Sequence, residues 1–510
     1  MQADVKRILV RNAAWNYVGF AVSLVTNFLL FPFVVHRAGE ASAGVWLLLG
    51  SLTGYMGLLE LGIVPSLTQH VATALGAGRR DEVNRAASTA LAILVGMMGV
   101  ALQVLWLVPT LIASLNIPPE LQADARALMT IALVGFAAKM PLAAFQALLL
   151  GCQRQDRCNQ LWIVLAVGKA GATVVLLLSG FGLVSVVLME AVAHVLAGGL
   201  QIAWVRRELP DLVLAWRFVD RGHGRAVVSL GATLLTMNLC SLVIEQTDRL
   251  VVGVFLPIAQ VTHYAAAWKL YMLAFSLPTI LLQALGPLAA MLHGRQEAST
   301  LRDVFLRMTK YSAAVALPLS LVVTAVSDIL LRYWMGPSFV DTRPALIALL
   351  VAFAVTAFNH AAYSTLLGMQ KLGALLWKYY LPQAAMNLAL SVILVHSLGT
   401  LGVALGTTIP ALLLQPVYLR HVFRATGVSP KAFWAASVAP LLLPLGVAFS
   451  PLVAAHAIQG ASWIGLLPLS LVCGCAYVAC FWAWGLDASE RGELVRVARL
   501  RSWRGVPQES

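Results

Sequence analysis

Long apolar stretches, separated by short polar or glycine- and proline-containing segments, recur along the whole chain. Each is about 20 residues or longer, enough for an α-helix to cross the roughly 30 Å hydrocarbon core of a bilayer. We therefore expect an all-α polytopic membrane protein. The predicted set is fourteen transmembrane helices, over residues 13–35, 43–69, 86–115, 123–151, 160–179, 182–204, 225–256, 260–292, 311–335, 343–369, 377–397, 399–419, 432–455 and 463–485.

Composition and charge agree with this pattern and add an orientation. The chain has 510 residues, of which 60% are hydrophobic and only 11% charged, against about 25% charged in an ordinary soluble domain. Most of its 35 Lys and Arg residues fall on segments of one side, and only Arg37, Arg126 and Arg343 fall in loops of the other. Basic loops stay in the cytoplasm, so both termini are expected there. Topology therefore accounts for the net charge of +13 without a nucleic-acid partner.

The two halves of the chain resemble one another. Residues 28–48 read FLLFPFVVHRAGEASAGVWLL, and residues 249–269 read RLVVGVFLPIAQVTHYAAAWK. In both, an apolar helix end meets a proline, a short polar turn follows, and a new helix begins at an aromatic residue. Two parallel six-helix repeats are the arrangement that alternating access requires. The predicted organisation is a bundle over 1–208, a second bundle over 209–424, two additional helices over 425–486 and a basic cytoplasmic tail over 487–510.

Two stretches carry a family resemblance. They are LLELGIVPSLTQHVA at 58–72 and TDRLVVGVFLPIAQVTHYAAAWKL at 247–270. Both are similar to sequences of the bacterial polysaccharide (O-antigen) flippases, within the multidrug/oligosaccharidyl-lipid/polysaccharide exporter superfamily. The resemblance implies translocation of undecaprenyl-diphosphate-linked oligosaccharide across the inner membrane for lipopolysaccharide or related surface polysaccharides. It also implies partners such as membrane lipids, a polysaccharide polymerase and chain-length machinery. Coupling to an H⁺ or Na⁺ gradient, as in an antiporter, is a separate hypothesis, motivated by the charges of both signs at Glu245, Asp248 and Arg249.

Two other functions stay open at this stage. A cation-coupled exporter of drugs or small amphiphiles belongs to the same superfamily, although such exporters usually have twelve helices. A membrane-embedded polysaccharide polymerase or ligase would carry a long outside loop, and the longest one predicted here is about ten residues. The sequence has no Walker, GxSxG or HExxH motif and no cysteine spacing typical of a metal site. We expect neither enzymatic activity nor a bound cofactor or metal.

The seventh predicted helix carries ionisable groups inside an apolar stretch. Its polar residues recur at helical spacing and share one face: Asn238, Ser241, Glu245, Asp248 and Arg249. A charge at the bilayer centre costs at least about 2.5–3.5 kcal/mol, so these groups either pair or line a pathway. A salt bridge between Arg249 and Glu245 or Asp248 would only lock the helix in place. A polar lane several turns long favours a transport pathway.

Further intramembrane polar residues complete the set of candidates. Lys139, Lys269 and Arg249 could neutralise a diphosphate, and Lys169 with Glu190 could pair or serve the same purpose. The amides Asn27, Asn238, Asn359 and Asn387 could bind sugar hydroxyls or bond between helices. We assign substrate binding to Arg249, Lys269, Lys139, Asn27, Asn238 and Asn359, and ion coupling to Asp248, Glu245 and Glu60.

Overall fold

The computed structural model describes residues 2–57, 62–220, 239–282, 285–457, 463–493 and 495. Most of these residues are helical, and none of them forms a β-strand. Ten of their helical stretches are long and apolar enough to cross a membrane. One of these, Gly373–Thr426, spans 54 residues and is broken at Gly399, whose φ of 59° is not helical. The expected all-α, membrane-spanning class is confirmed. The candidates Glu60 and Asn238 lie outside the described residues.

The chain packs as two compact units. The first unit contains Met1–Ala266 and Tyr380–Gly406, and the second contains Ala267–Tyr379 and Thr407–Ser510. The helices α10 (Ala259–Leu281) and α17 (Leu381–Thr426) therefore each contribute residues to both units. The sequence repeats over 1–208 and 209–424 describe internal symmetry and not packing. Their boundaries stay a prediction.

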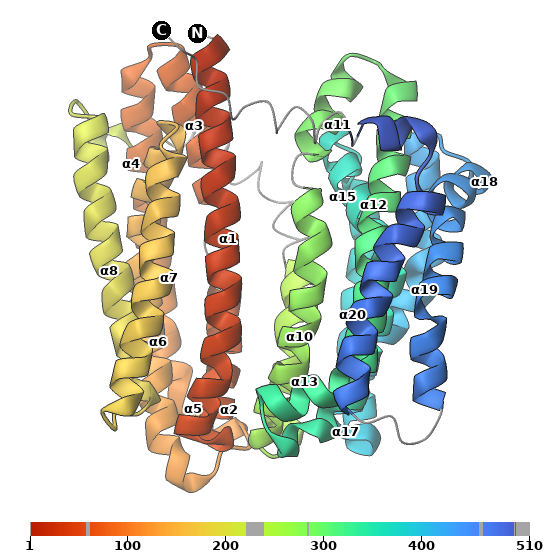
Figure 1. Cartoon of the computed structure of the whole chain (residues 1–510). Coiled ribbons are helices and arrows are strands. Elements are labelled where there is room, and N and C mark those ends of the chain that lie inside the picture. Colours follow the sequence, from red (N-terminus) through yellow and green to blue (C-terminus); the bar gives the residue numbers. More distant parts are fainter. Residues whose placement is uncertain are drawn as a thin grey trace, which may run out of the picture. The chain divides into compact units, whose positions relative to one another are not determined.

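The first unit is a bundle in which α6 is central (Figure 1). It packs against α2, α3, α4, α7 and α8, while α1 packs along α7. A helix over residues 239–255 and the first arm of α17 complete the unit. The remaining helices have these bounds: α1 Gln2–Ala38, α2 Glu40–Met56, α3 Ile63–Gly76, α4 Arg80–Gln103, α5 Val108–Ser114, α6 Gln122–Gly151, α7 Gln155–Leu178 and α8 Leu183–Glu208.

Small residues set the close approach of α6 to α8. A Cβ at Gly135 would lie 2.6 Å from the Cβ of Ala191, and a Cβ at Gly198 would lie 2.3 Å from a methyl of Leu142. Such contacts let two backbones pack tightly where hydrocarbon surroundings provide no hydrophobic driving force. The tight packing positions the polar residues of both helices, which are described below.

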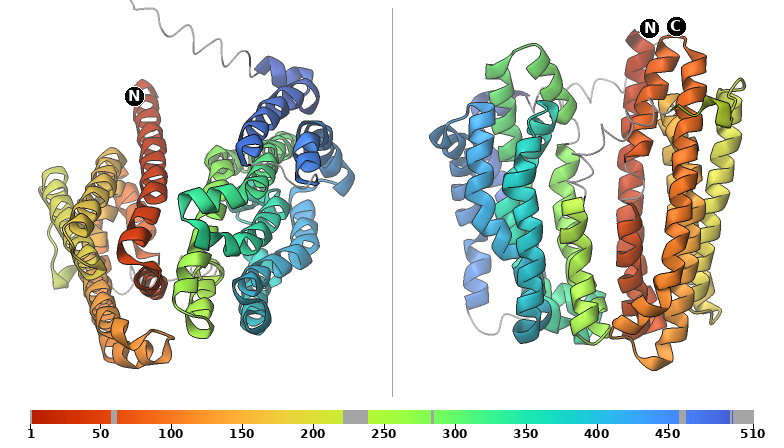
Figure 2. Two further views of the ribbon diagram at one scale, coloured as in Figure 1. Left: turned by 60° about the horizontal axis from the view of Figure 1, so that its bottom comes forward. Right: turned by 180° about the vertical axis from the view of Figure 1, so that it is seen from behind.

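The second unit is built around α12 (Figure 2). This helix packs against α14, α15, α19 and α20, and α19 packs along α20. The bounds are α11 Leu285–Gly294, α12 Ala298–Ala325, α13 Ser327–Trp334, α14 Arg343–Thr356, α15 Asn359–Gly368, α16 Gly373–Leu375, α18 Pro430–Phe433, α19 Ala439–Ala457 and α20 Trp463–Cys480. Three π-helical turns, at Leu376–Tyr380, Trp434–Val438 and Phe481–Gly485, adjoin α17, α19 and α20.

A buried ion pair fastens the segment after the last span to α12. Lys310 and Glu490 are 7% and 1% exposed, and Nζ lies 2.6 Å from Oε2. The Tyr311 hydroxyl donates to Oε1 of the same carboxylate at 3.0 Å. Asp487 caps the turn that holds Glu490. The backbone amide of Glu490 donates to Oδ1 of Asp487 at 2.8 Å, and the backbone amide of Asp487 donates to Oε2 of Glu490 at 2.9 Å.

Candidate functional site

Asp248 is the most enclosed of those predicted site residues that the structure describes. It is 0% exposed, and two neighbouring helices of the first unit donate to its carboxylate. The Tyr264 hydroxyl of α10 lies 2.5 Å from Oδ2, and the Asn387 amide of α17 lies 3.4 Å from Oδ1. The carboxylate thus joins three helices of this unit at one point. Ionised Asp248 accepts both hydrogen bonds, whereas protonation would add an O–H donor and reduce the acceptor capacity of one oxygen.

Arg249 donates to other side chains, and Glu245 lies close enough to interact with its charge. The Arg249 guanidinium donates to the Ser51 hydroxyl of α2 at 3.2 Å and to the Gln246 side chain at 3.3 Å. Glu245 is exposed, in contrast to Asp248. Successive residues of a helix are about 100° apart, so Asp248 and Arg249 meet different neighbours. Asp248 thus bonds to α10 and α17 and Arg249 bonds to α2, while Arg249 stays within electrostatic reach of Asp248, Tyr264 and Glu245.

The end of the 239–255 helix and the start of α10 lie against the α1–α2 turn and α2. The Thr262 hydroxyl donates to the Glu40 carbonyl at 2.7 Å, and the His263 Nε2 lies 3.0 Å from the Glu40 carboxylate. Gly44 makes this approach possible, because a Cβ there would lie 2.2 Å from the Ile258 carbonyl oxygen. These contacts pack the start of α10 against α2 within the first unit.

A second group of ionisable side chains lies on three adjacent helices of the first unit. We name it the α6–α8 cluster, and it consists of Lys139 on α6, Lys169 on α7, and Glu190 and His194 on α8. The Lys169 ammonium is 3.8 Å from Glu190, and the His194 ring Nδ1 lies 2.7 Å from the Glu190 carbonyl. His194 lies close enough to Lys139 and Lys169 to interact electrostatically with both ammonium groups. Two ammonium groups against one carboxylate leave an excess positive charge.

The remaining candidates form other contacts. The Asn27 amide donates to the Ser23 carbonyl of its own helix at 2.8 Å. Asn359 belongs to the second unit, where its side chain exchanges hydrogen bonds of 2.8 and 2.9 Å with Gln415. Lys269 is a half-buried residue of α10 in the same unit. The Asn359 side chain thus forms a hydrogen bond between helices, one of the two roles expected for the amides.

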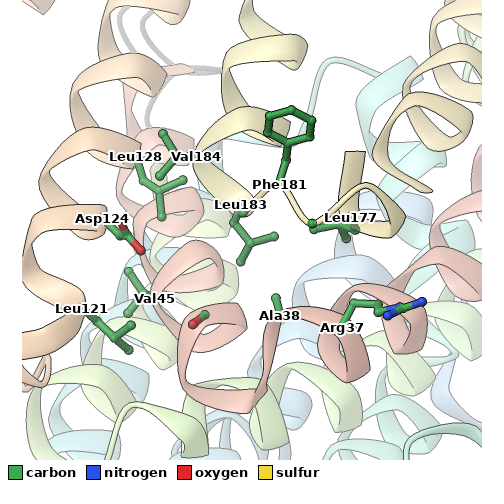
Figure 3. A pocket seen from close by; sticks show the side chains of 13 residues that line it. Arg37, Ala38, Val45, Leu121, Asp124, Leu128, Leu177, Phe181, Leu183 and Val184 are labelled. Atoms are coloured by element: carbon green, nitrogen blue, oxygen red, sulfur yellow. The ribbon is translucent and has the colours of Figure 1, made fainter. Parts of the chain in front are cut away.

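A hollow of about 360 Å³ opens in the first unit near the α1–α2 turn. Arg37 and Asp124 lie on opposite sides of it, with Ala38, Val45 and Leu183 between them (Figure 3). Most of its remaining lining is apolar and comes from α6 and the α7–α8 turn. It does not include the site residues predicted from the sequence.

Tyr264 and His194 are two polar residues of these groups that the sequence analysis did not assign to a site. Tyr264 stood within the 247–270 stretch, but only as the aromatic residue that opens a helix. A buried tyrosine hydroxyl needs a hydrogen-bond partner. Tyr264 follows Asp248 by sixteen residues, with a turn between their two helices, and this spacing could have indicated the contact. His194 lies four residues after Glu190, a helical spacing that would have grouped the two.

The fold and its buried polar groups define a multi-pass membrane protein. Its fold matches a structure described as the lipid II flippase MurJ in an inward closed conformation, with a TM-score of 0.71 and 12% identity, covering 92% of this chain and 98% of that one. It also matches an inward-facing multidrug resistance MATE family transporter of the MOP superfamily, with a TM-score of 0.65 and 17% identity, covering 80% and 96%. The chain thus has the fold of MOP superfamily transporters.

Sequence comparison identifies the family. The model of a family described as "Polysaccharide biosynthesis protein" matches residues 68–344, more than half of the chain. A curated relative, named "Putative O-antigen transporter" of Shigella flexneri, is 21% identical over 425 residues, covering 81% of this chain and 98% of its own length. The chain belongs to the polysaccharide biosynthesis protein family. The relatives named here are transporters and flippases, in agreement with the expectation that the chain is not an enzyme.

Proposed function

We propose that this protein is a flippase for undecaprenyl-diphosphate-linked oligosaccharide in the bacterial inner membrane. In this proposal the chain crosses the membrane fourteen times, with both ends in the cytoplasm, and works by alternating access. The polyprenyl tail stays in lipid while the diphosphate and sugars pass through the protein. The family and the name of the O-antigen relative support the substrate class.

The observation that carries the proposal is the excess positive charge of the α6–α8 cluster. Lys139, Lys169 and Glu190 all lie within helices long enough to span a membrane. A diphosphate passing through low dielectric requires cations. A drug exporter that carries cationic amphiphiles would require the opposite charge. The cluster therefore favours an anionic substrate over the drug-export alternative.

Asp248 is our candidate for coupling to an ion gradient, with Glu245 and Glu60 as further candidates from the sequence. Its carboxylate accepts from Tyr264 on α10 and Asn387 on α17. A proton or Na⁺ on this carboxylate would compete with those hydrogen bonds and so change the contact between three helices. Such a differential contact is what allows an ion to shift a conformational equilibrium.

The test is transport by the full chain in proteoliposomes. A fluorescent undecaprenyl-diphosphate oligosaccharide is placed in one leaflet, and its appearance in the other is followed with and without proton and Na⁺ gradients. We expect flipping by wild type, more than tenfold slower flipping by Asp248→Asn, and no transport of a cationic dye.

Two results would contradict separate parts of the proposal. Transport of the dye without flipping of the lipid-linked sugar would establish the exporter alternative. Unchanged flipping after both gradients are collapsed would remove the coupling role of Asp248. Insertion and thermal unfolding of each variant, measured alongside, separate loss of transport from loss of fold.

A further inference from the structure

An apolar groove of about 790 Å³ lies in the second unit, along the second arm of α17. Its α17 wall is a helical stripe made of Leu412, Gln415, Pro416, Leu419, Arg420, Phe423 and Arg424, and the facing wall contains Val355, Val428 and Pro430. Leu412, at the end of this stripe opposite the two arginines, is 41% exposed. The groove is therefore an open slot with hydrocarbon walls and two guanidinium groups at one end.

The two arginines are not needed to neutralise the end of their own helix. Arg302 and Lys371 already donate to the last α17 carbonyls, those of Thr426 and Ala425, at 3.0 and 3.2 Å. Arg420 and Arg424 are exposed, and neither forms an ion pair with any residue that the structure describes. Arg420 and Arg424 therefore keep their guanidinium donors for a ligand in the groove.

The neutral polar side chain of the lining is also occupied. Among the described residues of the groove, Gln415 alone carries an amide, and it bonds to the Asn359 side chain and, at 3.4 Å, to the Val355 carbonyl. No hydroxyl side chain lines the described walls. Apart from the two guanidinium groups, the described lining offers the hydroxyl groups of a glycan no free polar side chain. The lining suits acyl chains and one anionic head group.

We propose that this groove binds an anionic phospholipid of the inner leaflet, such as phosphatidylglycerol. Its acyl chains lie along Leu412, Leu419 and Phe423, and its phosphate is held between Arg420 and Arg424. Guanidinium groups bind phosphate oxygens in a bidentate manner, and basic pockets at the cytoplasmic ends of membrane helices recognise such head groups. The volume lies within the range of roughly 300–1,000 Å³ that ligand pockets occupy. The leaflet rests on the orientation given under the proposed function, whereas the binding site does not.

The test is retention of dioleoylphosphatidylglycerol by the full-length protein, measured by native mass spectrometry during a lipid titration in detergent. We expect one tightly retained molecule and binding about tenfold to thirtyfold weaker in Arg420→Ala/Arg424→Ala. The matched control is Arg206→Ala/Arg207→Ala, which removes two exposed arginines from the last turn of α8, outside the groove. This control should bind within about twofold of wild type.

A second pair of variants tests the apolar wall with the charges left in place. Leu419→Trp fills the groove and should also abolish retention. Leu413→Trp adds the same ring to a position that is 61% exposed and outside the lining, and it should bind normally. Thermal unfolding establishes that each variant is folded, and the Leu419 pair preserves the test if the double arginine variant is not.

Three results would overturn the proposal. They are unchanged binding in Arg420→Ala/Arg424→Ala, equal retention of zwitterionic dioleoylphosphatidylcholine, and preferential retention of undecaprenyl diphosphate over phosphatidylglycerol. Because the readout is lipid binding, it is independent of flipping. A failure of the transport proposal would leave this result intact, and a failure here would leave transport intact.

Discussion

The hydroxyl of Tyr264 donates a hydrogen bond to the buried carboxylate of Asp248 across 2.5 Å. Neither group is exposed, so each removes the cost that the other would incur if it were buried alone. Asn387 adds a donor from α17. The contact stabilises the fold of the first unit and at the same time keeps an ionisable group inside it.

Tyr264→Phe is expected to lower the free energy of unfolding by about 1–3 kcal/mol, because it removes one donor from a buried carboxylate. Thermal unfolding in detergent measures the change. The matched control is Tyr363→Phe, since Tyr363 is 38% exposed, and it should shift stability by less than about 0.5 kcal/mol. An equal shift in both variants would show that the Tyr264 hydroxyl has no special role.

Lys139→Gln is expected to raise the concentration of lipid-linked diphosphate needed for half-maximal flipping about tenfold, which corresponds to ~1.4 kcal/mol of lost charge attraction. The proteoliposome assay measures this concentration. Lys378→Gln removes the same charge from an exposed position of the π-helical turn before α17. If both variants behaved alike, the α6–α8 cluster would not be the diphosphate site.

Single and double substitutions of Lys310 and Glu490 form a thermodynamic cycle. Lys310→Met alone should destabilise by about 3–5 kcal/mol, because it leaves a buried carboxylate unpaired, and Lys310→Met/Glu490→Gln should recover much of that loss. Unfolding curves of the four proteins give the coupling. Additive effects would mean that the two groups do not interact in solution.

Gly44→Ala is expected to destabilise the first unit by about 1–3 kcal/mol or more, since the new Cβ would overlap the Ile258 carbonyl. Gly50→Ala, on the same helix, introduces its methyl where nothing lies within 4 Å. It should be neutral or slightly stabilising, because alanine favours helix over glycine. Equal melting temperatures for the two variants would contradict the close approach seen here.

Hydrogen bonds from the Glu490 amide and the Ser489 hydroxyl lower the pKa of Asp487. A lowered folded-state pKa stabilises the folded form above the unfolded value of about 3.9, and this stabilisation disappears as pH falls through the folded value. Hydrogen exchange over residues 488–493 should therefore show the same protection at pH 7 and pH 5. Asp487→Ala should lose about fivefold in protection at both, and Asp487→Asn much less. Loss of wild-type protection between pH 7 and 5 would exclude an ionised cap.

The sequence predicted the class of fold because hydropathy alone decides whether a helix can lie in lipid. It could not predict backbone events within apolar stretches. The predicted span 43–69 is divided into α2 and α3, and the span 86–115 becomes α4, a 3₁₀ turn at Val104–Leu107 and α5. The helix predicted from residue 311 begins at Ala298, because its amphipathic first turns lack the apolar signal.

The site was predictable to a similar depth. Helical periodicity grouped Asp248 and Arg249, and both lie in a polar environment. It could not reveal that Tyr264 and Asn387 donate to the first while Ser51 and Gln246 accept from the second. Gln246 lies on the same helix as Arg249. The other three partners lie on other helices, and tertiary packing alone brings them near.

The anchor formed by Lys310 and Glu490 also determines where the chain tolerates a fusion. A fluorescent reporter joined directly to Gly485 would remove the carboxylate and leave a buried ammonium without its counter-ion. A reporter joined beyond Glu493, which lies 3.4 Å from Arg307, leaves both contacts intact. For expression and purification of this protein, a C-terminal fusion should therefore begin about two helical turns after the last apolar helix ends.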